Sequence, residues 1–324
     1  MDEFETIARL FAPLTRGEPG ALGLGDDAAL LAPRPGFDLV LTKDAIVGGV
    51  HFFPDDPPAA IGAKLMRVNL SDLAAKGASP RAFLLAAALP PAVDDAWLTA
   101  FAAGIGADLD RFGGALVGGD TVSTSGPAVF SLTAIGEVPA GGMIRRAGAL
   151  PGDLVCVSGT IGDAALYVAH RLHRAEVAQI DQLEDRYRYP RPRLALGAAL
   201  RGLAHAGCDV SDGLVADLGH ICAQSGLGAV IEAGAVPLSP AARETLARRP
   251  ALLPTVLTGG DDYELVFALP PEADLAALEA VCPVSVIGRF EQGQGVRVLD
   301  RAGSPLKLDR TGWRHPVGRG DGSR

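Results

Sequence analysis

Between residues 141 and 152 the chain reads GGMIRRAGALPG, a stretch without apolar periodicity that ends in Pro151-Gly152. Glycine and proline interrupt helices and strands, so this stretch predicts a break between two domains. The chain has 324 residues, which is more than one average domain and fits two. We therefore expect an N-terminal domain over residues 1–148 and a C-terminal domain over residues 149–324.

Helical and strand-like patterns are mixed on both sides of this break. Before it, residues 38–42 (DLVLT) are typical of a buried strand that ends at Lys43-Asp44, and a helical pattern follows Pro57-Pro58. After it, helical stretches are mixed with strands expected at 154–158 and near 229–232, 263–269, 284–289 and 296–299. Because no regular strand–helix–strand rhythm appears, we expect α+β or mixed α/β halves and not one doubly wound sheet.

The overall composition indicates a packed globular protein with an acidic surface. Hydrophobic residues make up 48% and charged residues 21%, and the formal net charge is −9. This charge argues against nucleic acid or an anionic membrane as partner, although bound divalent cations could reverse the sign locally. The four cysteines form no CxxC pair and the N-terminus lacks an apolar signal core, so we expect a cytoplasmic protein.

Several common nucleotide and hydrolase motifs are missing. The chain has no GxxxxGK[ST] loop, no GxSxG nucleophile elbow and no HExxH helix. The segment GLGDDA at 23–28 fits the loose dinucleotide pattern GxGxxA, but that pattern needs a strand before it and a helix after it. Residues 17–20 (GEPG) form a poor strand, and two adjacent aspartates would repel a pyrophosphate without a metal ion, so this interpretation is weak.

Aspartates recur beside glycine, serine or threonine in five predicted turns and one helix. Each has an ordinary explanation alone, because aspartate and glycine favour turns and Asp212 could cap the following helix. The set is harder to explain in that way, because Asp44, Asp120 and Asp209 each follow a short apolar strand. The segments concerned are Gly25–Asp27, Thr42–Asp44, Asn69–Asp72, Gly118–Thr121, Asp209–Gly213 and Thr258–Asp262.

Carboxylates that follow strands are expected to converge on one edge of a sheet, where they repel one another unless cations lie between them. Mg²⁺ prefers such oxygen ligands and is usually shared with substrate phosphates. The adjacent glycines allow backbone N–H groups to approach phosphate oxygens closely. The residues alone therefore predict a site where metal ions hold the phosphates of a nucleotide.

In their order and spacing, these segments resemble the thiamine-monophosphate kinase family over nearly the whole chain. That family belongs to a superfamily with aminoimidazole ribonucleotide synthetase. The matching segments are GLGDDAALL (23–31), TKD (42–44), GVHF (49–52), VNLSDLAA (68–75), GGDT (118–121), RAG (146–148), PGD (151–153), DVSDGL (209–214), DLGHI (217–221) and GGDDYEL (259–265).

This resemblance implies a two-domain fold of the aminoimidazole ribonucleotide synthetase type. Its N-terminal α+β domain would pair its sheet with that of a second copy in a homodimer, and its C-terminal domain would be α/β. It implies ATP and several Mg²⁺ ions between the domains, and it leaves K⁺ open as a further ion. The implied reaction moves the γ-phosphoryl group of ATP onto thiamine monophosphate, giving thiamine diphosphate and ADP.

The resemblance also assigns roles residue by residue. Metal-binding positions are Asp27, Thr42, Lys43, Asp44, Asp72, Asp120, Asp209 and Asp212. ATP-contacting positions are Gly119, Asp120, Arg146 and Ser211, and positions that contact the acceptor substrate are His51, Asp261 and Trp313. No side chain is expected to act as a general base, because a phosphate monoester has its second pKa near about 6 and is already ionised.

Three positions depart from the family pattern. Lys43 stands where threonine is usual, Asp261 where glutamate is common, and Ala102 where an aromatic residue is frequent. Lys43 favours one alternative, a non-catalytic module that binds nucleotide or metal on the same fold. A selenophosphate synthetase is a second alternative, but it needs a reactive cysteine in an N-terminal glycine-rich loop, and the first cysteine here is Cys156.

Overall fold

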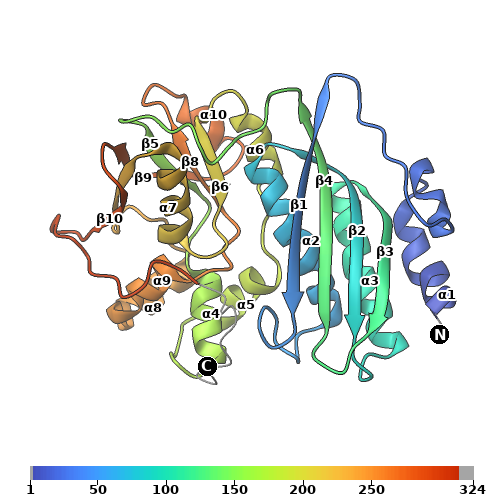
Figure 1. Cartoon of the computed structure of the whole chain (residues 1–324). Coiled ribbons are helices and arrows are strands. Elements are labelled where there is room, and N and C mark those ends of the chain that lie inside the picture. The colour runs from blue at the N-terminus through green and yellow to red at the C-terminus, as the bar shows by residue number, and fades with distance from the viewer. Residues whose placement is uncertain (1–2, 314–324) are drawn as a thin grey trace.

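Two β-sheets, each packed against helices, organise the chain in a computed structural model that describes residues 3–313 (Figure 1). The N-terminal sheet has the strand order β1-β4-β2-β3, and the C-terminal sheet has the order β10-β7-β9-β5-β8-β6. The strands are β1 (Phe37–Val47), β2 (Ser79–Leu89), β3 (Ala115–Ser123), β4 (Val129–Pro139), β5 (Leu154–Ser158), β6 (Ala206–Asp209), β7 (Gly228–Glu232), β8 (Leu265–Leu269), β9 (Val284–Glu291) and β10 (Gly295–Leu299).

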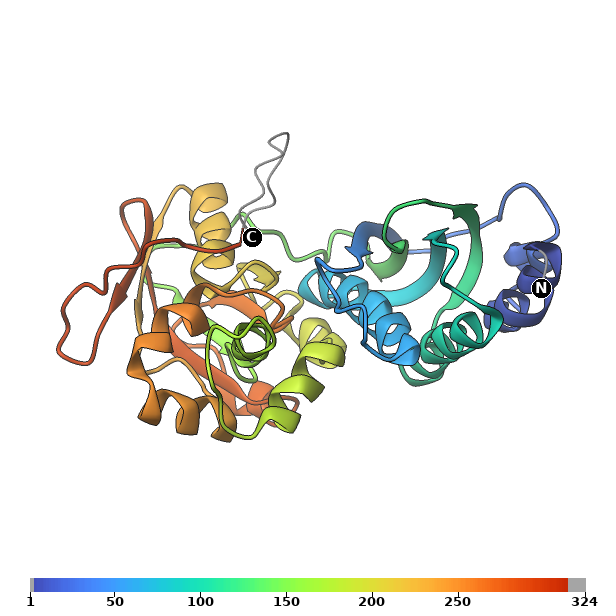
Figure 2. The same ribbon diagram turned by 90° about the horizontal axis from the view of Figure 1, so that it is seen from below.

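In the N-terminal half, α2 (Pro58–Ala75) and α3 (Asp95–Phe112) cover one face of the sheet (Figure 2). The core between these helices and the sheet contains Phe101 of α3 and Phe130 of β4, whose ring centroids lie 4.4 Å apart. The opposite face is only partly covered, by the short 3₁₀ helix Pro19–Leu24, and leaves Leu41 65% and Leu84 36% exposed. This sheet therefore keeps an apolar surface on the side away from its helices.

In the C-terminal half, the neighbouring strands β5 and β8 are buried along their whole length inside the sheet. All neighbouring strands pair antiparallel except β7 and β10, which are parallel. The expectation of mixed α/β halves is confirmed. The helices of this half are α4 (Asp163–Arg171), α5 (Ile180–Arg188), α6 (Leu194–Leu200), α7 (Leu214–Ser225), α8 (Pro240–Arg248), α9 (Leu253–Thr258) and α10 (Leu275–Glu279).

Helix α2 lies at the junction of the two halves and packs against β1 and β4 on one side and α6 and β6 on the other (Figure 1). It is buried along most of its length, including the polar residues Lys64, Asn69 and Ser71. No helix within residues 3–313 is long and apolar enough to cross a membrane.

Two expectations from the sequence are wrong. Strand β1 does not end at Lys43-Asp44 but continues to Val47, because it stays paired with β4 along its full length and Ile46 returns to the core. Asp120 likewise lies inside β3, and only Asp209 ends its strand. The dinucleotide interpretation also fails, because a 3₁₀ helix and not a strand comes before Gly25.

Candidate functional site

Four aspartates from both halves of the chain gather at the junction, and we call them the aspartate cluster: Asp44, Asp72, Asp209 and Asp212. Asp44 lies on β1, and β1 alternates so that Asp44 and Thr42 share a side with the buried residues Val40 and Ile46. Burial and the negative charges of Asp72 and Asp212 raise the pKa of Asp44 from 3.8 to about 6. The cluster therefore holds carboxylates so close together that ionising all of them is unfavourable.

Hydrogen bonds from α2 and β1 fix the orientation of this cluster. The Thr42 hydroxyl donates to Asp72, and the Asp44 backbone N–H donates to Asn69 Oδ1 over 2.9 Å. Ser71 Oγ donates to Asp209 Oδ2 over 2.8 Å. Burial, followed by the charges of Asp72 and Asp217, raises the pKa of Asp209 well above its ordinary value, against the smaller effect of that hydrogen bond.

The turn from Asp209 to Gly213 is shaped by Asp217. The Asp217 carboxylate accepts the backbone N–H groups of Ser211, Asp212 and Gly213 over 3.0, 2.9 and 3.1 Å. Gly213 has φ +124°, and a Cβ there would lie 2.8 Å from backbone atoms of Thr258, so the turn requires glycine. Asp217 therefore fixes the backbone that carries Ser211 and Asp212.

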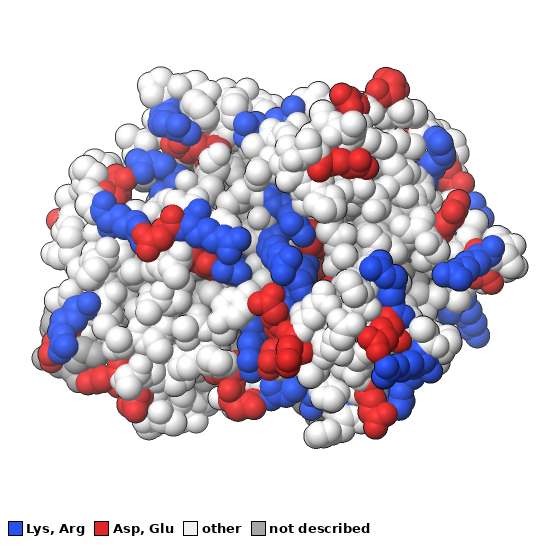
Figure 3. All heavy atoms as spheres, turned by 180° about the vertical axis from the view of Figure 1, so that it is seen from behind, with Lys and Arg blue, Asp and Glu red and all other residues white. Residues whose placement is uncertain are grey.

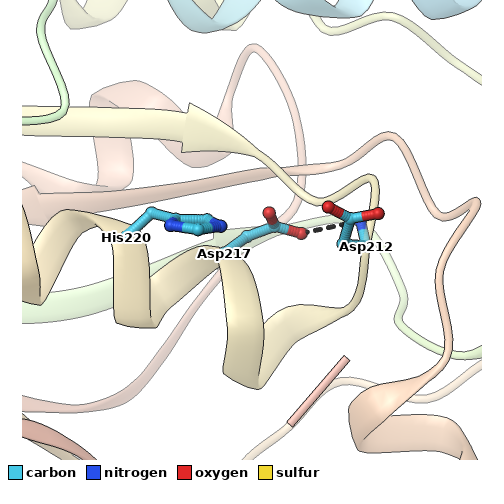
Figure 4. A group of neighbouring side chains, drawn as sticks. All are labelled: Asp212, Asp217 and His220. Atoms are coloured by element: carbon cyan, nitrogen blue, oxygen red, sulfur yellow. Dashed lines mark hydrogen bonds between the residues drawn. The ribbon is translucent and has the colours of Figure 1, made fainter. Parts of the chain in front are cut away.

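Asp212, Asp217 and His220 form a compact group at this turn (Figure 4), with one potential metal ligand from each lying within 4.8 Å of the others. Asp217 and His220 belong to the DLGHI segment, to which no role was assigned from the sequence. Their spacing of three residues on a helix places them on one face and could have indicated a joint role.

Lys43 does not enter the aspartate cluster with its side chain. It is exposed, lies on the opposite side of β1 from Thr42 and Asp44, and its Nζ donates to Thr133 Oγ1 over 3.4 Å. The side chain therefore neither replaces nor repels a cation among the aspartates, and a metal contact at this position would rest on the backbone.

Three other predicted residues lie away from the cluster within one chain. Gly119 and Asp120 are exposed on β3, at the opposite edge of the sheet from Asp44, with β4 and β2 between them. Three strand spacings separate the two edges by roughly 14 Å. Asp27 is exposed in the loop before β1, where its N–H donates to Asp26 over 2.7 Å.

Two neighbouring hollows adjoin the cluster and share His220 in their linings. The first, which we call the basic hollow, has a volume of about 380 Å³ and is lined by Lys76, Arg145, Arg146 and His220, among others. Burial lowers the pKa of Lys76, whose Nζ donates to the Gly207 carbonyl over 2.9 Å. This hollow brings Arg146 together with cations that the sequence prediction omitted.

The second hollow, of about 580 Å³, is lined by Asp212, His220 and Trp313, among others, and we call it the tryptophan hollow. The Trp313 backbone N–H donates to the Asp212 carbonyl over 2.9 Å, which brings the indole next to the aspartate cluster. An aromatic ring beside carboxylates suits a flat cationic ligand.

His51 and Asp261, the remaining predicted contacts, meet at a buried lysine. Lys64 Nζ donates to the His51 carbonyl and to Asp261 Oδ2, each over 2.9 Å. His51 Nδ1 accepts the Val47 N–H over 3.0 Å, which fixes its ring at the end of β1. Carboxylates, a basic hollow and an aromatic ring thus lie side by side, an arrangement suited to binding cations, a polyphosphate and a cationic ring.

Comparisons with known proteins match both halves of the chain to one family. Residues 25–138 match the family described as AIR synthase related protein, N-terminal domain, and residues 151–301 match its C-terminal domain. The chain is 46% identical to a thiamine-monophosphate kinase of Caulobacter vibrioides, over 97% of this chain and 90% of that protein.

Two solved structures are also similar. The crystal structure of thiamine-monophosphate kinase from Stenotrophomonas maltophilia superposes with a TM-score of 0.80 at 42% identity, covering 90% of this chain and 96% of that one. A structure described as AaThiL complexed with AMPPCP and TMP superposes with a TM-score of 0.78 at 30% identity, covering 92% and 97%.

Proposed function

This chain belongs to the thiamine-monophosphate kinases among the AIR synthase related proteins, and on that premise we propose the reaction and site that follow. It is a kinase that transfers the γ-phosphoryl group of ATP to thiamine monophosphate, giving thiamine diphosphate and ADP. The observation that carries this proposal is the aspartate cluster, which lies beside both a basic and an aromatic hollow. The four cysteines are free and buried, which supports a cytoplasmic site of action.

The aspartate cluster fits Mg²⁺ by the chemistry of its donors. Carboxylate oxygens of Asp44, Asp72, Asp209 and Asp212, with the Thr42 hydroxyl, are the hard ligands that this ion prefers. The raised pKa of Asp44 supports the same assignment, because a cation among these carboxylates would relieve their mutual repulsion. When bound, Mg²⁺ would neutralise phosphate charge and help to align donor and acceptor.

The chain's own residues would act mainly by positioning the two anions. Arg146 and Lys76 in the basic hollow suit the ATP phosphates, with Ser211 at the adjoining turn. His51, Asp261 and Trp313 are proposed to contact the acceptor, whose thiazolium ring is a flat cation suited to Trp313 and Asp261. No residue need remove a proton, because the acceptor phosphate is ionised above its second pKa of about 6.

A direct assay tests this function. The purified protein is incubated with ATP, Mg²⁺ and thiamine monophosphate, at several K⁺ concentrations, and thiamine diphosphate is measured by chromatography. We expect product that depends on Mg²⁺. Binding of ATP and Mg²⁺ without product under all conditions would instead favour the non-catalytic module.

We further propose that the active unit is a homodimer with composite sites. Asp44 and Asp120 lie at opposite edges of one sheet, so both can serve one site only if the second copy supplies one of them. The exposed Leu41, Leu84 and Val122 of this sheet support pairing with a copy of itself.

Mixing two inactive variants tests the composite site. We expect Asp44→Ala and Asp120→Ala to be nearly inactive alone. In co-expressed mixtures about half of the dimers are mixed, and one of their two sites is intact, so activity should return to about a quarter of wild type. Turnover of the unseparated mixture measures this, and the tagged and purified mixed dimers should reach about half of wild type. Failure of the mixed dimers to exceed either parent would contradict the composite arrangement.

The aspartate cluster also predicts how stability depends on pH and Mg²⁺. The folded protein raises the pKa of Asp44 from 3.8 to about 6 and that of Asp217 to about 7, so it binds protons there that the unfolded chain has released. Their contribution to stability is therefore complete below about pH 4 and is lost as pH rises through about 6 and 7. Without Mg²⁺, melting temperature should fall over this range.

Two comparisons isolate this effect from other titrating groups. The Asp44→Asn variant, which cannot ionise at this position, should show a smaller fall in melting temperature than wild type. Adding Mg²⁺ at about pH 8 should raise the melting temperature of wild type more than that of the variant. Equal pH slopes and equal Mg²⁺ responses in the two proteins would contradict the assignment of Asp44.

A further inference from the structure

Lys64, on the second turn of α2, is a buried cation held by three different segments of the chain. Only 2% of the residue is exposed. Its Nζ donates to the His51 carbonyl and to Asp261 Oδ2, each over 2.9 Å, and lies 3.5 Å from the centre of the Tyr187 ring. A buried ammonium group is costly unless it is paired, so this set of partners must be maintained in the folded protein.

The partners of Lys64 come from both halves of the chain. His51 follows β1 in the N-terminal half, whereas Asp261 and Tyr187 belong to the C-terminal half. Each of the proposed acceptor contacts, His51 and Asp261, also accepts a hydrogen bond from a tyrosine. Tyr187 Oη donates to the His51 carbonyl over 3.0 Å, and Tyr263 Oη donates to Asp261 Oδ1 over 3.1 Å. One ammonium group thus links the two proposed contacts across the junction.

The turn that carries Asp261 depends on its surroundings. Asp261 has φ +72° and Tyr263 has φ +51°, left-handed conformations that are uncommon for residues with side chains. Such a turn persists only where other contacts determine it. Two contacts hold this turn. The Gly162 N–H donates to the Asp262 carboxylate over 2.8 Å, and Lys64 Nζ donates to the neighbouring Asp261 carboxylate.

We propose that Lys64 is a positioning residue for the acceptor substrate, a role that rests on the proposed function. It fixes the distance between the segment of His51 and the turn of Asp261, and it compensates part of the Asp261 charge. Asp261 keeps 23% of its side chain exposed, so it can still meet a ligand. The proposed nucleotide contacts Arg146 and Ser211 are not partners of Lys64. Its loss should therefore weaken binding of the acceptor and not of ATP.

The Lys64→Met variant tests this by separating the two substrates. The change removes the charge and keeps a side chain of similar length. We expect KM for thiamine monophosphate to rise by roughly tenfold or more, while KM for ATP changes by less than about threefold. Titration calorimetry with thiamine monophosphate in the presence of Mg²⁺ should show the same loss of affinity.

A second variant, with a smaller change, keeps the proposal testable if Lys64→Met does not fold. Tyr187→Phe keeps the ring above Lys64 and removes only the hydrogen bond to the His51 carbonyl. It should raise KM for thiamine monophosphate by roughly threefold, with KM for ATP unchanged. Both effects in the same direction support the positioning role.

A matched control comes from another charged contact across the junction. Basic and acidic side chains gather along the middle of the rear face of the molecule (Figure 3). Among the ion pairs that join the two halves, Arg188 Nε lies 2.8 Å from Asp56 Oδ1 and neither residue is a proposed substrate contact. Arg188→Met therefore reports what loosening the junction alone does to both KM values.

The outcomes are distinct. A selective rise in the acceptor KM for Lys64→Met and Tyr187→Phe, absent in Arg188→Met, supports the proposal. An unchanged acceptor KM in folded variants, a loss of kcat alone, or a parallel rise in both KM values overturns it. If the wild-type protein forms no thiamine diphosphate and does not bind thiamine monophosphate, the proposed function fails first and this inference with it.

Discussion

We expect the Asp44→Ala protein to turn over thiamine monophosphate about a thousandfold more slowly than wild type while remaining folded. Burial, and then the charges of Asp72 and Asp212, raise the pKa of Asp44, so Asp44 lies close to both of these carboxylates. Its removal would take away a central member of the proposed ligand set for the cations that would bring the two phosphates together. Initial rates at saturating ATP and thiamine monophosphate measure the loss.

The fold should survive this substitution, because the ionised Asp44 carboxylate is repelled in the absence of cations. Far-ultraviolet circular dichroism and a melting curve without Mg²⁺ should match or exceed those of wild type. Asp38→Ala is the matched control, since Asp38 lies on the same strand but is exposed and outside the cluster. Near-normal turnover by a folded Asp44→Ala protein would contradict the metal role of this residue.

The largest effect on stability is expected from Glu264→Ala. Glu264 is fully buried and accepts from Arg186 over 2.8 Å, from Arg193 over 2.5 Å and from Ser158 over 2.5 Å. Its removal leaves two guanidinium groups without their shared partner, one of them buried, which costs about 3–5 kcal/mol. That is a large part of the roughly 5–15 kcal/mol that stabilises a typical protein. Urea unfolding at equilibrium measures the change.

An exposed glutamate provides the comparison. Glu244 pairs with Arg248 one helical turn away, and both side chains are at least 37% exposed. Glu244→Ala should leave the free energy of unfolding within about 0.5 kcal/mol of wild type, because exposed pairs contribute little. A Glu264→Ala protein as stable as Glu244→Ala would show that the buried network does not hold the domain together.

The sequence could predict those features of the fold that depend on local patterns. Helices and strands mixed without a regular rhythm in both halves indicate α+β or mixed α/β halves, and Asp209 ends its strand as expected. The end of β1 differs from the prediction because polar residues at 42–44 resemble the end of a buried strand. In a half-buried strand every second side chain can be polar, and pairing with β4 carries the strand on to Val47.

Contacts between segments that are distant in the chain are harder to predict from the sequence. Lys64 looks like an ordinary polar position on a helix, and only the approach of the Asp261 turn, about two hundred residues later, gives it a partner. Asp217 accepts N–H groups from the preceding turn, a contact that forms only once the turn is folded. The separation of Asp120 from Asp44 depends on strand order, which local patterns do not encode.

Helix α2 sets the spacing between the parts of the proposed site. It carries Lys64 toward the proposed acceptor contacts, Ser71 and Asp72 toward the aspartate cluster, and Lys76, just past its end, toward the basic hollow. A rise of 1.5 Å per residue sets the distance from Lys64 to Lys76 at about 18 Å. One inserted residue would lengthen that span by about 1.5 Å and turn everything beyond it by about 100°. The spacing between the proposed sites for acceptor, cations and polyphosphate therefore depends on the length of this single helix.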